Sequence, residues 1–161
     1  MSAKAFICGC AGPALSAEEI AFVKDARPWG LILFRRNVED REQVRALTSS
    51  FRDALGRDDA PVLVDQEGGR VQRLTQPHWR KYPSAAFFER MGWNDPYYVR
   101  EMTRLSARLM GADLREVGIT VDCAPVADVP APGSHEIVGD RAYAADPARA
   151  AVLARAAAEG L

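Results

Sequence analysis

The sequence lacks an excess of charge of either sign. Its 161 residues include 21 lysines and arginines against 22 aspartates and glutamates, which gives a formal net charge of -1. Without a basic stripe there is no electrostatic case for nucleic acid or an anionic membrane surface as a partner. Long apolar runs are missing too, since no stretch approaches the roughly 20 apolar residues of a membrane-spanning helix. We therefore expect no nucleic acid and no membrane among the partners.

Cysteine and histidine are also scarce. The three cysteines, Cys8, Cys10 and Cys123, form neither a paired disulfide framework nor a C-x-x-C metal knuckle. This pattern favours a reducing, cytoplasmic location. The only histidines, His78 and His135, have no second histidine or carboxylate at ligand spacing on a helix. We therefore expect a cytoplasmic protein with no metal ion and no cofactor.

What the chain does contain is an alternation of short apolar runs and amphipathic helices. The runs are typical of buried parallel strands and cover residues 5–10, 29–34, 61–65 and 119–124. Helices are predicted from the capping box at Ser16, over 40–55, from 96 to about 117, and from 147 to about 160. The repeated βα order predicts a parallel sheet with ligand-binding groups at the carboxyl ends of its strands.

Two architectures fit this order. One is an open doubly wound sheet, and the other is the first half of a (β/α)8 TIM barrel. A complete barrel usually takes about 250 residues, so the chain has room for about four βα units. Its composition, 48% hydrophobic and 27% charged, suits a single globular domain. We expect residues 1–161 to be the N-terminal portion of one barrel domain, ending near its midpoint.

The densest cluster of polar residues follows the third apolar run, in the sequence PVLVDQEGGRVQRL at residues 61–74. Asp65 ends the run, and Glu67, Arg70 and Arg73 come soon after it. Carboxylates accept hydrogen bonds from hydroxyls and guanidiniums donate them, so the cluster could hold a polyhydroxylated ligand such as a sugar. The alternative is an ion-pair network, of Asp65 or Glu67 with Arg70 or Arg73, that only orders a loop. The residues alone favour neither the sugar site nor the ion-pair network.

The string DQEGGRVQRL closely resembles the signature of the bacterial β-N-acetylglucosaminidases of glycoside hydrolase family 3, enzymes of peptidoglycan recycling. Three further strings match the same family in the same order: WGLILFRRN, GITVDCAPVADV and IVGDRAY. The resemblance covers nearly the whole chain. It implies the barrel fold and favours the sugar site over the ion-pair network.

The resemblance also implies which residues bind substrate. The positions that match the sugar ligands of the terminal subsite are Asp65, Arg73 and Arg141. For Arg141 alone, a loop-ordering salt bridge with Asp140 would be the default interpretation. We interpret Asp122, inside the predicted fourth strand, and Asp128, in the loop after it, as structural.

The implied reaction is hydrolysis of terminal β-linked N-acetylglucosamine from muropeptides, with retention, through a covalent glycosyl-enzyme. The resemblance implies an aspartate nucleophile late in the barrel and a histidine, assisted by an aspartate, on the loop after the fifth strand. The KH and PGHG strings that also follow the fifth strand are absent here. We therefore expect the catalytic residues beyond Leu161, an inactive chain on its own, and a monomeric full-length protein. Two alternatives remain: a family 3 β-glucosidase, and a non-catalytic half-barrel module that binds sugar.

Overall fold

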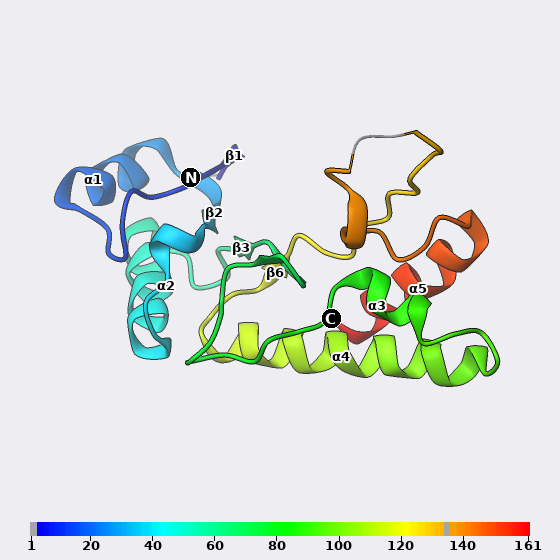
Figure 1. Ribbon diagram of the computed structural model, residues 1–161. Coiled ribbons are helices and arrows are strands. Elements are labelled where there is room, and N and C mark those ends of the chain that lie inside the picture. The colour runs from blue at the N-terminus through cyan, green and yellow to red at the C-terminus, as the bar shows by residue number, and fades with distance from the viewer. Residues whose placement is uncertain (1–2, 134–135) are drawn as a thin grey trace. The chain divides into compact units, whose positions relative to one another are not determined.

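The computed structural model describes residues 3–133 and 136–161, and it divides into two compact units (Figure 1). The first unit contains the chain up to Asp65 together with Asp113–Asp122. The second contains Gln66–Ala112 and Cys123–Leu161. The chain thus leaves the first unit directly after Asp65 and returns to it within a helix.

A parallel sheet forms the centre of the first unit. Its strands are β1 (Lys4–Cys8), β2 (Pro28–Leu33), β3 (Val62–Val64) and β6 (Val121–Asp122), in the order β1-β2-β3-β6. Each neighbouring pair is parallel, with Leu33 opposite Val64 and Val64 opposite Asp122. The predicted parallel sheet is therefore confirmed, although β1, β3 and β6 are shorter than the apolar runs that predicted them.

Two helices of the first unit begin at capped residues, the first at the predicted capping box and the second one residue after its predicted start. Before α1 (Ala17–Ala26), the Ser16 hydroxyl accepts from the Glu19 amide at 3.2 Å, and the Glu19 carboxylate accepts from the Ser16 amide at 2.8 Å. Asp40 precedes α2 (Arg41–Leu55) and accepts from the Gln43 amide at 2.8 Å. The η1 turn (Arg35–Asn37) separates β2 from α2. The core of the unit contains the buried residues Leu31, Leu33, Val44, Leu47, Phe51, Val62 and Val64.

Side chains of α2 fix the end of α4 (Pro96–Glu116). The Thr48 hydroxyl donates to the carbonyl oxygen of Val117 at 3.0 Å, and Arg52 Nη2 donates to that of Gly118 at 2.7 Å. These bonds satisfy carbonyl groups that a helix leaves without partners at its C-terminus. They also set the start of the segment that enters β6.

The second unit begins with a small hairpin. Its strands are β4 (Gln66–Gly68) and β5 (Val71–Gln72), which pair antiparallel with Gln66 opposite Gln72. After it come α3 (Ala85–Arg90), α4, the η2 turn (Gly139–Arg141) and α5 (Pro147–Gly160). The sequence predicted one long connection over 66–94, and the structure corrects this to a hairpin and a helix. Strands of three and two residues are too short to show a hydrophobic period.

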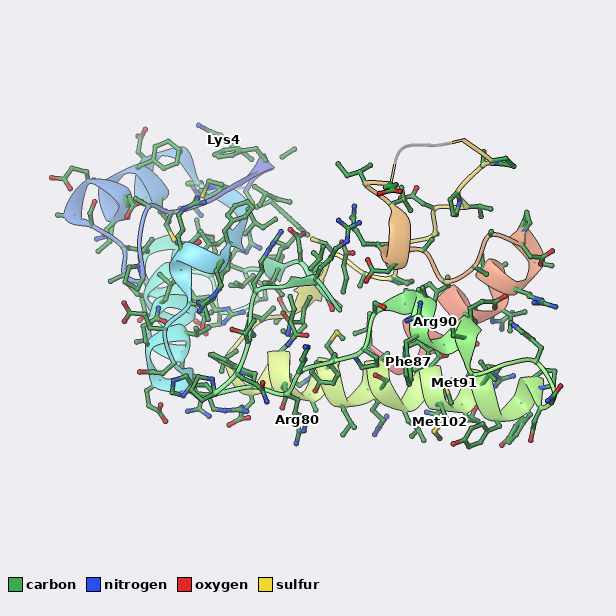
Figure 2. All side chains as sticks on the ribbon, viewed as in Figure 1. Lys4, Arg80, Phe87, Arg90, Met91 and Met102 are labelled. Atoms are coloured by element: carbon green, nitrogen blue, oxygen red, sulfur yellow. The ribbon has the colours of Figure 1, made fainter. Side chains whose placement is uncertain are left out.

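Helices α3, α4 and α5 enclose the core of the second unit. Its buried members are Ala85, Phe88, Val99, Ala107, Tyr143, Leu153, Ala154 and Ala157. Met102 of α4 packs against this cluster, and Figure 2 labels it together with Phe87 and Arg90 of α3 and Met91, which follows α3. The predicted start of α5 is confirmed, and Asp146 caps it by accepting from the Arg149 amide at 2.8 Å. In the part of the chain that the structure describes, no helix has the length and apolarity to cross a membrane.

Candidate functional site

Polar residues follow the parallel strands of the first unit at their carboxyl ends. Asp65 comes directly after β3 and is half-buried, as the apolar run before it predicted. Asn37, after β2, is fully buried. Its side-chain amide donates to the carbonyl oxygens of Cys10 and Gly12 at 3.1 and 2.8 Å. Asn37 therefore ties the chain after β1 to the chain after β2, at the sheet edge where parallel α/β folds bind ligands.

The hairpin that follows Asp65 is anchored by a buried amide. Gln66 is 1% exposed, and its Oε1 accepts from the backbone amides of Arg73 and Leu74 at 2.9 and 3.0 Å. Its Nε2 donates to the Leu74 carbonyl at 2.9 Å. One side chain thus uses its acceptor and its donor to hold the backbone at Arg73, the second of the predicted sugar ligands.

A second buried amide extends this arrangement. Gln72 Nε2 donates to the carbonyl oxygens of Leu74 and Arg80 at 2.8 and 2.6 Å, and its Oε1 accepts from the Tyr82 amide at 3.1 Å. Buried polar groups with satisfied hydrogen bonds favour one backbone conformation over its alternatives. The segment from the hairpin to Tyr82 is therefore ordered by two glutamines.

The third predicted ligand, Arg141, is held by the hairpin as well. Its Nε donates to Glu67 Oε2 and its Nη2 to Glu67 Oε1, both at 2.8 Å. The Glu67 side chain is 8% exposed and that of Arg141 is 28% exposed. A bidentate pair between a guanidinium and a carboxylate fixes the plane of the guanidinium as well as its position. Glu67 therefore determines the orientation of Arg141.

A second ion pair joins the same two segments. Arg70, in the turn of the hairpin, donates from Nε to Asp140 Oδ1 at 2.8 Å. The sequence suggested pairs between residues close together in the chain: Asp65 or Glu67 with Arg70 or Arg73, and Asp140 with Arg141. The structure pairs Glu67 with Arg141 and Asp140 with Arg70, over much longer separations.

The structure places the three predicted sugar ligands as follows. Asp65 ends the first unit, whereas Arg73 and Arg141 belong to the second. Within the second unit, β4 connects to both arginines, through Gln66 to the backbone of Arg73 and through Glu67 to the side chain of Arg141. Their role as sugar ligands stays a prediction. Sequence reasoning missed Glu67 as the partner of Arg141, because the 74 positions between them hide the contact.

His78, Cys8 and Cys10 make contacts outside this cluster. The His78 ring lies edge-on to Trp79, with 5.9 Å between ring centroids, and His135 is outside the described residues. Burial raises the pKa of the Cys8 thiol and raises that of Cys10 to about 11. Both thiols are therefore protonated near neutral pH. Within residues 3–133 and 136–161 there is no group of three or more histidines, cysteines, aspartates and glutamates that could hold a metal ion.

Comparison with known sequences identifies relatives along nearly the whole chain. The sequence model described as "Glycosyl hydrolase family 3 N terminal domain" matches residues 6–161. A beta-hexosaminidase of Methylococcus capsulatus is 39% identical over 150 residues, which cover 93% of this chain and 43% of that protein. The chain thus spans less than half the length of this relative.

Solved structures give the same result. A NagZ structure from Neisseria gonorrhoeae, in complex with N-trifluoroacetyl-D-glucosamine, matches with a TM-score of 0.91 and 29% identity, over 99% of this chain and 46% of that one. A family 3 β-N-acetylglucosaminidase from Paenibacillus matches with a TM-score of 0.83 and 26% identity, over 96% of this chain and 29% of that one. Together with the parallel sheet, these matches confirm the predicted barrel-type α/β fold class.

Proposed function

We propose, from the premise that the chain belongs to glycosyl hydrolase family 3, that the protein takes part in hydrolysing terminal β-linked N-acetylglucosamine. The observation that carries this proposal is the contact between two family strings, DQEGGR and GDR, through Glu67 and Arg141. The substrates we propose are muropeptides released from peptidoglycan, and the location is the cytoplasm. The reaction retains the configuration of the sugar.

The three predicted ligands suit a sugar chemically. The Asp65 carboxylate can accept hydrogen bonds from two hydroxyl groups, and the guanidiniums of Arg73 and Arg141 can donate to hydroxyl and acetamido oxygens. Discrimination of N-acetylglucosamine from glucose depends on such donors, because a site built for a polar substituent rejects a ligand that lacks it. This chain therefore supplies the binding part of the site in our proposal.

Catalysis needs further groups. Retaining glycosidases usually place two carboxyl groups about 5 Å apart, one as nucleophile and one as acid/base. The family resemblance implies a different division of these tasks: an aspartate late in the barrel is the nucleophile, and a histidine assisted by an aspartate lies on the loop after the fifth strand. The KH and PGHG strings also belong after that strand, and neither occurs among the 161 residues. We propose that the region corresponding to the rest of the relatives contributes both groups.

Titration of the isotope-labelled chain with N-acetylglucosamine tests the binding part. We expect a Kd of about 1 mM, from roughly -0.3 kcal/mol for each ligand heavy atom, and markedly weaker binding of glucose. Arg141→Lys should weaken the affinity, because lysine cannot form the bidentate pair. Arg155→Lys is the matched control, since Arg155 is 82% exposed on α5 and pairs only locally, with Glu159.

Two results would contradict the proposal. Equal affinity for glucose and N-acetylglucosamine would favour the β-glucosidase alternative, and no affinity for either would remove the binding role from this chain. Release of the chromophore from a chromogenic β-N-acetylglucosaminide by the 161-residue chain, above the blank, would show that the catalytic groups are assigned to the wrong region.

A further inference from the structure

We propose that Arg70 is a positioning residue for Arg141, and that it acts through the backbone of residues 136–140 without touching the sugar. This inference rests on the proposed function, because it assigns Arg141 to the sugar site. Glu67 binds the Arg141 side chain, whereas this inference concerns the backbone of the residues that precede Arg141.

The contacts of Arg70 cover the whole approach to η2. Its Nη2 lies within hydrogen-bond distance of the carbonyl oxygens of Ile137 at 2.6 Å, Val138 at 3.2 Å and Glu136 at 3.4 Å. Its Nε donates to the Asp140 carboxylate at 2.8 Å. A single guanidinium therefore holds three successive carbonyl groups and the side chain that precedes Arg141.

Gly139 leaves room for Arg70. Gly69 and Gly139 both have positive φ, of 57° and 44°. A Cβ atom on Gly139 would lie 3.3 Å from Arg70 Nη2, which is a tight contact. A Cβ atom on Gly69 would make only ordinary contact with Asp140 Oδ2 at 3.4 Å, and its close neighbour would be Ser84 Cβ at 2.6 Å. The glycine of the GDR string is therefore the one that bears on the contact of Arg70.

The attachment has two parts of unequal strength. Arg70 and Asp140 are 48% and 40% exposed, and an exposed ion pair changes an equilibrium constant by less than about fivefold. The carbonyl contacts strengthen it, because hydrogen bonds from a charged donor are roughly twice as strong as neutral ones. Arg141 is then restrained twice: Glu67 fixes its side chain, and Arg70 fixes the backbone from which that side chain extends.

Hydrogen exchange and sugar affinity, measured on the same variants, test the proposal. In Arg70→Ala we expect the amides of Arg141 and Ala142, which bond to Val138 and Gly139, to exchange about tenfold faster. We expect the Kd for N-acetylglucosamine to rise about fivefold as well. Asp140→Asn keeps the acceptor oxygen and should stay within about twofold of the wild type.

Controls separate positioning from general stability. Arg155→Ala removes an exposed ion pair of the same unit, with the same 2.8 Å separation, and should change neither readout. If Arg70→Ala does not fold, Arg70→Lys provides the test, because lysine keeps the charge but lacks the fork that reaches several carbonyls. We expect Lys at this position to raise the Kd by about threefold.

The outcomes distinguish this inference from the function on which it rests. An unchanged Kd in Arg70→Ala, with faster exchange at Arg141, would overturn the positioning role and leave the proposed function intact. Unchanged exchange at Arg141 would overturn it as well. A wild-type chain that binds no sugar would overturn the proposed function, and this result does not depend on any variant of Arg70.

Discussion

Glu67 and Arg141 are 74 residues apart in the sequence and share two parallel hydrogen bonds of 2.8 Å. The carboxylate is 8% exposed, so water screens the pair little. An isolated charge at such a depth would be costly, and each group supplies the compensation that the other needs. The pair therefore joins two family strings into one structural element, and it is the first target for mutation.

Glu67→Gln should weaken sugar binding more than it weakens the fold. The variant keeps one acceptor oxygen for Arg141 but loses the charge and the second acceptor. Because hydrogen bonds to charged groups contribute about 1.5–3 kcal/mol, we expect the Kd for N-acetylglucosamine to rise about tenfold. Calorimetric titration of the wild type and the variant measures this change.

Glu159→Gln is the control for that experiment. Glu159 also accepts from an arginine at 2.8 Å, but its pair with Arg155 is local and exposed, so we expect its loss to leave the affinity unchanged. If Glu67→Gln bound the sugar as tightly as the wild type, Glu67 would not orient Arg141 toward a ligand. Equal losses in both variants would indicate a general effect of charge.

Gln66→Leu should lower the free energy of unfolding by about 3 kcal/mol, because it leaves buried backbone groups of Arg73 and Leu74 without partners. Urea unfolding followed by circular dichroism measures this loss. Lys81→Ala is the control, since Lys81 is exposed on the same segment and its removal should change the stability by less than about 0.5 kcal/mol. A loss below 1 kcal/mol in Gln66→Leu would show that water replaces the amide.

Gln66 and Glu67 also show what the sequence could and could not predict. Hydrophobic period and capping residues are local, so the four parallel strands and the helices that begin after Ser16, Asp40 and Asp146 were predictable. The lengths of β1, β3 and β6 were not, because the ladder of hydrogen bonds ends where a neighbouring strand ends. The partners of Gln66 and Glu67 depend on tertiary contacts that no local pattern encodes.

In the candidate site, too, local features were predictable and tertiary contacts were not. Asp65 could be placed at a strand end, because an apolar run stops at it. Arg73 and Arg141 were predicted from the family strings alone. The hydrogen bonds that hold them depend on the hairpin of β4 and β5, which the sequence did not predict. Arg70 had no predicted partner beyond nearby acids, although its contacts reach across 66 to 70 positions.

Removal of a helix cap tests each unit by itself. Asp40→Ala and Asp146→Ala each remove a side chain that accepts from a backbone amide at 2.8 Å, one at α2 and the other at α5. Each should lower the stability by about 1 kcal/mol. Amide exchange shows where: the first variant should increase exchange in α2, and the second in α5. Asp58→Ala, at an exposed turn, is the control, and equal exchange in all three would contradict the assignment.

Alkaline pH should destabilise the first unit through Cys10. Burial, with a smaller contribution from the charge of Glu19, raises the pKa of this thiol from 9.0 to about 11. Below pH 9 the thiol is protonated in both the folded and the unfolded chain. Between pH 9 and 11 the unfolded chain loses the proton and the folded chain keeps it, so the stability falls as the pH rises.

Two pH units correspond to about 3 kcal/mol, and Cys10→Ala should lose this part of the pH dependence. The measurement is urea unfolding at several values between pH 8 and 11, with Cys123→Ala as a control in which an exposed thiol is removed. Cys10→Ala should be less stable than the wild type at pH 8, because it also loses the contact of Asn37 with the sulfur at 3.2 Å. That difference should shrink toward pH 11. If it stays constant instead, the thiol ionises equally in both states, and burial at the end of β1 does not protect it from water.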